Sequence, residues 1–223
     1  MNRVLKILFF GVLVKPLVLV VLGLHIVNRR ALPLLGPAVI AANHNSHLDT
    51  LVLMSLFPLS RIHQVRPVAA ADYFLKNPLL AWFSLNIIGI IPLQRKHCRN
   101  IEKLFKQCHQ ALDDKDILII FPEGTRGKPG QMGSIKKGLF YLLKDRRDTE
   151  IIPVVMRGLG QALPRGEALF VPFNCDVIIG NQLRLPDDSK EFPRNLAEVY
   201  KELSRHCLTR AGMEEDEEVE ETE

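Results

Sequence analysis

The sequence has few cysteines, and their spacing gives no sign of a disulfide framework. Its 223 residues include Cys98, Cys108, Cys175 and Cys207, and no two of them form a Cys-x-x-Cys pair. This pattern is typical of a protein in a reducing compartment. The chain also has no internal repeat, so a repeat architecture is not indicated.

Acidic residues are scarce everywhere except at the end of the chain. Eight of the 25 Asp and Glu residues lie in residues 214–223, which hold no base, so the remainder carries 17 acids against 29 Lys and Arg. This body has a formal net charge of +12. Such a charge suits anionic partners: phospholipid surfaces, phosphorylated substrates or nucleic acid. The tail, residues 213–223, is expected to be disordered.

A long apolar stretch occupies residues 4–27. It is long enough to span a bilayer, but Lys15 and Pro16 interrupt it near the middle. A Lys at mid-membrane costs about 2.5–3.5 kcal/mol, and a Pro ends or kinks a helix. We therefore predict two short helices that dip into one leaflet, the alternatives being one kinked span or a pair of soluble core helices. The bases expected near the headgroup phosphates are Lys6, Lys15, Arg29 and Arg30.

Strand and helix patterns alternate along the rest of the chain. Strands are predicted at 38–42, 66–71, 88–95, 116–121, 151–157 and 176–180, and helices at 51–56, 79–87, 98–113, 134–147 and 189–211. The alternation predicts an α/β fold: a mainly parallel central sheet covered by helices on both sides, preceded by an N-terminal apolar two-helix membrane segment. The predicted boundaries are 1–30 for the membrane-associated segment, 31–212 for the folded domain and 213–223 for the tail.

The most informative stretch is residues 43–49, Asn-His-Asn-Ser-His-Leu-Asp, between the strand at 38–42 and the following helix. Ligands bind at the carboxyl ends of strands in open α/β sheets. Ser46 is a candidate N-cap, with Asp49 as the acidic member of a capping box. The positive end of the helix favours a neutral His44 imidazole, and a carboxylate that holds this ring would make it a general base. The alternative is that Asp49 only closes the capping box.

Four short blocks stand at strand ends. Besides residues 43–49 they are Gly-Ile-Ile-Pro-Leu-Gln-Arg at 89–95, Phe-Pro-Glu-Gly-Thr-Arg at 121–126 and Ile-Ile-Pro-Val at 151–154. In this order and spacing, over residues 38–158, they resemble the four motifs of the glycerolipid acyltransferases, especially the bacterial 1-acylglycerol-3-phosphate acyltransferases. The resemblance implies an acyltransferase domain at 31–212. It also implies an enzyme without cofactors that moves a fatty acyl group from acyl-CoA or acyl-acyl-carrier protein to a lysophospholipid.

The resemblance assigns roles to eight residues. His44 would be the general base and Asp49 would hold its ring. The phosphate and glycerol of the acceptor would be bound by Arg95, Glu123, Gly124, Thr125 and Arg126, with Lys136 as a further candidate for the phosphate. Two arginines suit a dianionic phosphate, because the guanidinium fork matches its oxygens. Plainer readings exist: a surface Arg95, a turn glycine at 124, an exposed Lys136. Residues 51–56 and 79–87 could line an acyl tunnel or simply pack in the core.

The resemblance also implies partners and a location. The acceptor would be 1-acylglycerol-3-phosphate, giving phosphatidic acid, and the protein would work on a phospholipid membrane surface, not on nucleic acid. The location implied is the bacterial inner membrane, with the active site on the cytoplasmic side. The alternatives are another lysolipid or amino-lipid acceptor, a non-catalytic lipid-binding protein, and a metal-dependent lipid phosphohydrolase using His44, His47 and Asp49. We expect no metal, because a metal site normally takes three or more clustered ligands.

Overall fold

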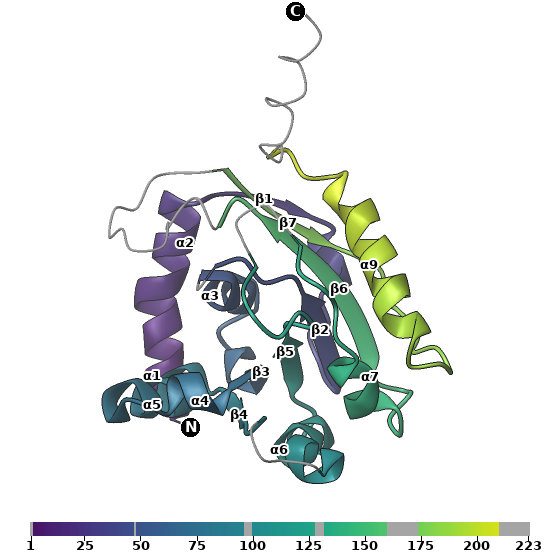
Figure 1. Ribbon diagram of the computed structural model, residues 1–223. Coiled ribbons are helices and arrows are strands. Elements are labelled where there is room, and N and C mark those ends of the chain that lie inside the picture. The colour runs from purple at the N-terminus through teal and green to yellow at the C-terminus, as the bar shows by residue number, and fades with distance from the viewer. Residues whose placement is uncertain (1, 47, 96–99, 128–131, 160–173, 210–223) are drawn as a thin grey trace, which may run out of the picture.

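The computed structural model describes residues 2–46, 48–95, 100–127, 132–159 and 174–209. Within them the chain forms a seven-stranded sheet of order β1-β7-β6-β2-β5-β3-β4 (Figure 1). The strands are β1 Gly23–Val27, β2 Ala38–Ala42, β3 Val65–Ala70, β4 Ile91–Leu93, β5 Ile117–Ile120, β6 Glu150–Arg157 and β7 Asn174–Ile179. The predicted tail at 213–223 lies outside the described residues.

The sheet is mainly parallel, as predicted. Strands β6, β2, β5, β3 and β4 run in one direction, and β7 is antiparallel to β6 and parallel to β1. These five strands are rich in apolar residues, and all five residues of β2 are buried. This composition is typical of a parallel strand covered on both faces. Because these strands share a direction, their carboxyl ends meet at one edge of the sheet.

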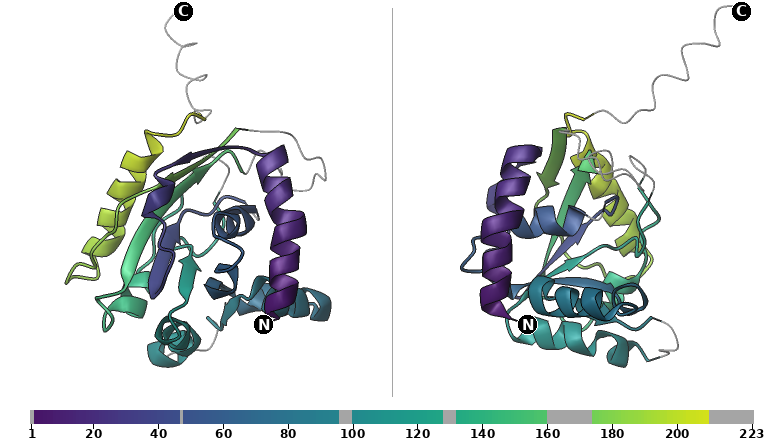
Figure 2. Two further views of the ribbon diagram at one scale, coloured as in Figure 1. Left: turned by 180° about the vertical axis from the view of Figure 1, so that it is seen from behind. Right: turned by 90° about the vertical axis from the view of Figure 1, so that its left-hand side faces the viewer.

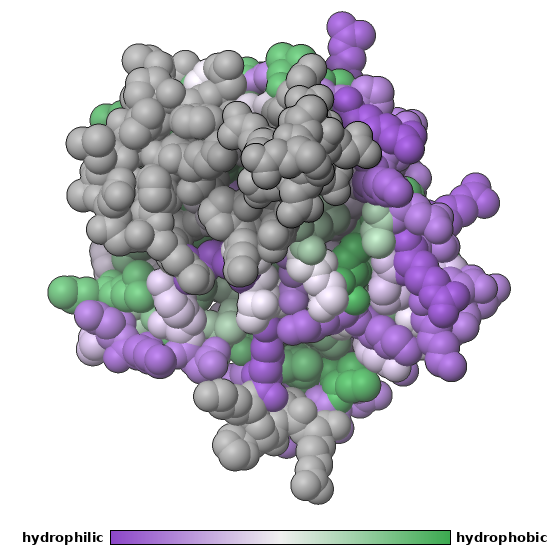
Figure 3. Space-filling view, turned by 45° about the horizontal axis from the view of Figure 1, so that its top comes forward, coloured by the Kyte–Doolittle hydropathy of each residue, from purple (hydrophilic) through white to green (hydrophobic). Residues whose placement is uncertain are grey.

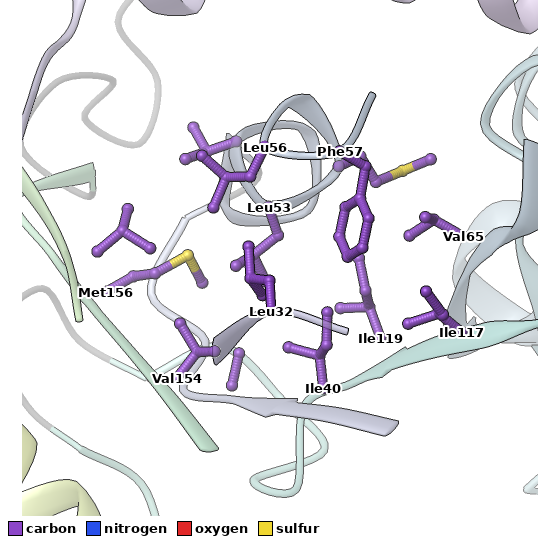
Figure 4. Packing of buried hydrophobic residues seen from close by; sticks show 14 of the residues in the cluster. Leu32, Ile40, Leu53, Leu56, Phe57, Val65, Ile117, Ile119, Val154 and Met156 are labelled. Carbon is purple, nitrogen blue, oxygen red and sulfur yellow. The ribbon is translucent and has the colours of Figure 1, made fainter. Parts of the chain in front are cut away.

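Helices cover both faces of the sheet (Figures 1 and 2). They are α1 Arg3–Leu8, η1 Phe9–Val14, α2 Lys15–Val21, η2 Arg29–Ala31, α3 Leu48–Ser55, η3 Ile62–Gln64, α4 Ala71–Phe74, α5 Pro78–Phe83, η4 Ser84–Ile88, α6 Ile101–Asp113, α7 Gly138–Leu143 and α9 Glu191–Ser204. The N-terminal helices and α3 cover one face, where Leu53 and Phe57 pack on Ile40 and Ile119 (Figure 4). On the other face α6, α7 and α9 bury a second core that includes Leu139 and Leu196.

The N-terminal region differs from the prediction of two helices. The segments α1, η1 and α2 follow one another without a break, as the single purple rod in Figure 1. Pro16 does not end the helix, because it lies in the first turn of α2 directly after the π-helical η1, where the Lys15 N–H bonds the Phe10 carbonyl five residues back. Such π-turns change the hydrogen-bond pattern of the helix locally, so the helix can continue past a proline, which has no N–H to donate.

The last residues of the expected membrane segment also have a different structure. Gly23–Val27 form β1, which pairs in parallel with β7, so the segment shares the sheet with the rest of the chain. One side of the helical rod enters the core through Phe10, Val14 and Val18, each at most 3% exposed. Within the part of the chain that the structure describes, no helix has both the length and the apolarity that crossing a bilayer needs.

Lys6 was expected near lipid headgroups, and the structure contradicts this. Its side chain is 0% exposed, and its Nζ donates to the Val65 carbonyl over 2.8 Å. Burial, with a smaller effect of the Arg66 charge, lowers the pKa of the Lys6 ammonium to about 7. A side chain so enclosed cannot contact phosphates. The other three bases lie at the surface or partly exposed, and Arg29 donates to the Leu56 carbonyl.

Candidate active site

Three strand ends bring the expected site residues to one edge of the sheet. His44 follows β2, Arg95 follows β4, and the block at 121–126 follows β5. Strand β2 pairs with β5, and β3 lies between β5 and β4, all in parallel. This edge is where ligands bind in open α/β sheets.

The expected contact between His44 and Asp49 is present. His44 Nδ1 lies 2.9 Å from Asp49 Oδ2, and the side chains are 20% and 1% exposed. An ionised carboxylate can only accept hydrogen bonds, so in the neutral imidazole Nδ1 carries the proton and Nε2 keeps its lone pair. The pair is therefore arranged as a base whose ring orientation is fixed by a buried carboxylate.

Asp49 also closes the start of α3. Its Oδ2 accepts hydrogen bonds from the main-chain N–H groups of Asn45 (2.7 Å) and Ser46 (2.8 Å), while Ser46 Oγ accepts from Leu48 N–H (3.2 Å). The carboxylate return to Ser46 is the reciprocal bond of a capping box. The capping role and the imidazole contact thus coexist on one oxygen, and neither excludes the other.

Two contacts near His44, one made by an aromatic ring and one by a side-chain amide, are not predicted by the sequence. The imidazole stacks on the Phe121 ring with centroids 4.0 Å apart and planes 18° apart. Asn43, buried, bonds the main chain of Met156 in β6 through both ends of its amide, with distances of 2.6 and 2.9 Å. Both residues lie inside the sequence blocks, but their partners are distant in sequence. They hold the ring and the strand end that precedes it.

Glu123, which is expected to contact the acceptor, is buried against main-chain N–H groups. Its Oε1 accepts the His44 N–H over 2.9 Å, its Oε2 accepts the Gly133 N–H over 2.8 Å, and the residue is 2% exposed. Burial raises the pKa of the Glu123 carboxyl, and the two N–H donors offset part of this effect. Both oxygens are used by the main chain, so Glu123 joins the His44 loop to the loop after β5.

The expected phosphate ligands converge around Gly124. Arg95 Nη1 donates to the Gly124 carbonyl over 2.7 Å. Gly124 has φ +74°, and a Cβ built there would lie 3.2 Å from Arg95 Nη1 and 3.4 Å from Lys136 Nζ. The glycine therefore serves both a turn that needs positive φ and the close approach of two cations. Their charges favour an anion at this place.

A pocket of about 490 Å³ contains most of the expected site residues, although Glu123 and Lys136 do not line it. His44, Arg95, Gly124, Thr125 and Arg126 all line it, and the Arg126 guanidinium lies 5.7 Å from the centre of the Tyr73 ring. Nothing in the sequence had pointed to Tyr73. The remaining wall is mostly apolar and includes members of the two stretches, residues 51–56 and 79–87, that could line a tunnel or pack in the core: Leu51, Leu80 and Phe83. Such a mixture of apolar wall and few convergent polar groups is typical of a ligand site.

The described residues hold no group of three or more His, Cys, Asp and Glu that could bind a metal ion. His47, a member of the metal alternative, lies outside those residues, as does Cys98. Cys108, Cys175 and Cys207 are free thiols.

Comparison with known families gives a match over most of this structure. The family model described as Acyltransferase matches residues 23–157, from the first residue of β1 to the last residue of β6, which is more than half of the chain. The chain belongs to the Acyltransferase family. The match contains the dyad of His44 and Asp49, Arg95 and the whole 121–126 block.

Several relatives share the name 1-acyl-sn-glycerol-3-phosphate acyltransferase. The chain is 32% identical over 144 residues to "1-acyl-sn-glycerol-3-phosphate acyltransferase LPAT1, chloroplastic" of Arabidopsis thaliana, covering 64% of this chain and 38% of that protein. It is 27% identical over 194 residues to "1-acyl-sn-glycerol-3-phosphate acyltransferase alpha" of Mus musculus, covering 79% and 65%. The chain thus spans less than two thirds of the length of these relatives.

A solved structure has the same fold. It is the 1-acyl-sn-glycerophosphate (LPA) acyltransferase PlsC from Thermotoga maritima, with a TM-score of 0.68 and 19% sequence identity. The alignment covers 93% of this chain and 82% of PlsC. At this identity the likeness concerns the fold, and it confirms the α/β architecture with a mostly parallel sheet.

Proposed function

We propose that this protein transfers a fatty acyl group from an acyl thioester to the free hydroxyl of 1-acylglycerol-3-phosphate, giving phosphatidic acid. The observation that carries the proposal is the His44 imidazole, held by the buried Asp49 in the wall of a pocket that also contains Arg95 and Arg126. Membership of the Acyltransferase family and the names of the relatives support it. A base and cations in one pocket are what a hydroxyl acceptor with a phosphate requires.

In the proposed reaction His44 Nε2 removes the proton of the acceptor hydroxyl as the hydroxyl oxygen attacks the thioester carbonyl carbon. The carbon–sulfur bond then breaks, and the thiolate takes the proton from the imidazolium. The products are an ester and a free thiol, so atoms and charge balance without a covalent acyl-enzyme. Asp49 stabilises the imidazolium that forms between the two proton transfers. The donor is acyl-CoA or acyl-acyl-carrier protein, and its fatty chain fits the apolar wall near Leu51, Leu80 and Phe83.

Arg126→Ala tests the phosphate in this proposal. Losing one charge-assisted contact costs about 1.5–3 kcal/mol, so we expect the KM for lysophosphatidic acid to rise about 10- to 150-fold. The KM for the acyl donor should change much less, because the donor's reacting group carries no phosphate. Steady-state kinetics with each substrate varied in turn measure both values.

Arg205→Ala is the matched control, since Arg205 is an exposed arginine paired with Glu202 at the end of α9. It should leave both KM values near wild type. An uncharged monoacylglycerol should be a poor acceptor for the wild-type protein. Equal use of this acceptor, or no acceptor-specific defect in Arg126→Ala, would remove the phosphate from the site and leave the acyl transfer standing.

We further propose that the protein works at a phospholipid membrane surface, the bacterial inner membrane, with the active site on the cytoplasmic side. The exposed side of the N-terminal rod carries Val4, Leu8, Val12, Leu13 and Leu17, and α5 adds Leu79 and Trp82. A small group of apolar side chains, in green beside purple hydrophilic ones, is visible at the left edge of Figure 3, the side on which α1 and α5 lie in Figure 1. Exposed apolar residues rimmed by bases are suited to an anionic lipid surface. The free thiols fit a reducing compartment.

Point substitutions test the membrane surface better than a deletion, because removing residues 1–30 would also remove β1 and part of the core. Val12 and Leu13 are 73% and 55% exposed. Since burying one such side chain contributes about 1.5–3 kcal/mol, Val12→Glu combined with Leu13→Glu should weaken binding to anionic liposomes at least about tenfold. Co-sedimentation in high salt measures this.

Leu208→Glu is the control, because Leu208 is a 69% exposed leucine outside the helical rod. It should bind liposomes like the wild type. If the double substitution bound as tightly as this control, another surface would have to be the membrane contact.

A further inference from the structure

A second pocket, of about 310 Å³, lies beside the first, and no step of the proposed reaction uses it. Its apolar wall includes Leu93 in β4, Leu104 and Phe105 in α6, and Leu139 and Leu142 in α7. All of these side chains pack in or against the core that α6, α7 and α9 cover. The second pocket therefore opens on the opposite face of the sheet from the N-terminal helices.

The two pockets meet at the carboxyl edge of the sheet. They share Val68, Arg95, Phe121 and Gly124 as lining residues. His44 lines only the first pocket and stacks on Phe121, so this ring stands between the imidazole and the second pocket. The apolar residues Ile88 and Ile90 of the first pocket belong to the core on the N-terminal-helix face. One hydrophobic pocket thus lies on each side of the sheet edge, with the reacting centre near their junction.

The charged residues where the two pockets meet indicate which kind of ligand the second pocket binds. Arg95 and Lys136 both line the second pocket, and both approach Gly124, within 3.2 and 3.4 Å of the position of an added Cβ. Apart from these cations the lining side chains are apolar or absent. An amphiphile with a hydrocarbon chain and an anionic head matches this pattern. The amide-rich arm of an acyl thioester donor does not, because amides buried against apolar walls lose hydrogen bonds to water.

We propose that the second pocket binds the fatty chain that the acceptor already carries, while the first pocket takes the chain of the donor. The inference rests on the proposed function and goes beyond it by giving each of the two chains its own pocket. The acceptor phosphate then lies at the junction of the two pockets, against Arg95 and Lys136 on the side of the second pocket and Arg126 on the side of the first. The glycerol hydroxyl reaches past Phe121 and Gly124 toward His44. The two chains approach the reacting centre from opposite faces of the sheet.

The test uses monomeric lysophosphatidic acids with chains of increasing length, assayed below their micelle concentrations and without membranes. Each buried methylene contributes about 0.8 kcal/mol, so the KM of the wild-type protein should fall by up to about fourfold per methylene until the pocket is full. The dependence on donor chain length is measured in parallel. Soluble acceptors are needed because a chain already in a bilayer gains nothing on moving into a pocket.

Gly138→Leu is the main variant. Gly138 lines the second pocket at the start of α7, and a Cβ added there meets no heavy atom within 4 Å, so the first atom of a larger side chain displaces nothing. Leu104→Trp narrows the same pocket from the opposite wall, on α6. In both variants, the ratio of KM between the shortest and the longest acceptor should be at least tenfold smaller than in the wild-type protein. The dependence on donor chain length should be unchanged.

Leu80→Trp, in the first pocket only, is the crossed control and should alter the donor dependence alone. A wild-type KM that does not vary with acceptor chain length would overturn the inference, with acyl transfer itself intact. So would a loss of donor dependence in Gly138→Leu, which would give the second pocket to the donor. No transfer to lysophosphatidic acid of any chain length would instead refute the proposed function.

Discussion

Replacing His44 with alanine should lower the kcat of acyl transfer by about 10²–10⁴-fold, the usual effect of losing a general base. The acceptor hydroxyl is a weak acid, and among the described residues that line its pocket His44 is the one whose free ring nitrogen can take a proton. The side chain is only 20% exposed but lies at a pocket wall, so its removal should not unfold the chain. Steady-state kinetics of the purified variant measure the loss of kcat, and a thermal melt measures whether the variant is folded.

His25→Ala is the matched control for this substitution. His25 Nδ1 lies 2.9 Å from Asp176 Oδ1, which repeats the His–Asp geometry away from the pocket. Asp176 is buried and also binds Thr209, so losing His25 tests what an equivalent structural contact costs. His25→Ala should keep kcat within a few-fold of wild type. A well-folded His44→Ala protein that turns over as fast as the His25→Ala protein would exclude His44 as the base.

Asp49→Asn should have the next largest effect, a fall in kcat of about 10²–10⁴-fold with little change in either KM. The amide oxygen can still accept the N–H groups of Asn45 and Ser46, so the start of α3 should remain closed. The neutral amide cannot stabilise an imidazolium, and it no longer fixes the proton on Nδ1. The readout is the split between kcat and KM, together with the melting temperature.

Asp49→Ala separates the two roles of this carboxylate. It removes the acceptor for both N–H groups, and loss of a helix cap costs about 0.5–2 kcal/mol, so its melting temperature should fall below that of Asp49→Asn. Its kcat should be as low as that of Asp49→Asn. If Asp49→Asn kept wild-type turnover and only Asp49→Ala were impaired, Asp49 would be a helix cap and nothing more.

The central sheet could be predicted because most of its strands have a recognisable local sequence pattern. Runs such as residues 38–42 and 117–120 are short, apolar and separated by helical patterns, and that alternation leaves few topologies other than a parallel sheet. The blocks at 43–49, 89–95 and 121–126 also stand at strand ends, where the parallel direction alone brings them together. The contact of His44 with Asp49 spans five residues, so it too was within reach of the sequence.

The N-terminal region could not be predicted in the same way. Hydropathy stays high from the helical rod through Gly23–Val27, so no polar turn marks the change from helix to strand. The partner of β1 is β7, about 150 residues later, with Gly23 opposite Asn174. Likewise the acceptor for the Lys6 ammonium is the carbonyl of Val65, which only the folded sheet brings near. Contacts between residues far apart in the sequence determine these features, and the local sequence pattern does not indicate such contacts.

The role of Glu123 shows the same limit within the site. Its sequence block indicates a contact with the acceptor, but Glu123 lines neither pocket, and its partners are the N–H groups of His44 and Gly133. The contact to His44 joins residues 79 apart in the chain. The stacking of Arg126 over Tyr73 is similar, because Tyr73 belongs to α4 and stands outside all four blocks. Sequence blocks therefore located the site, while the fold determined what each side chain in it contacts.

The most direct test of the central claim is the stoichiometry of the reaction in excess chelator. The purified wild-type protein is incubated with lysophosphatidic acid and an acyl thioester, and free thiol, phosphatidic acid and inorganic phosphate are followed together. The account predicts one thiol released for each phosphatidic acid formed, no phosphate, and no effect of the chelator. Phosphate release that the chelator stops, or thiol release without phosphatidic acid, would contradict it.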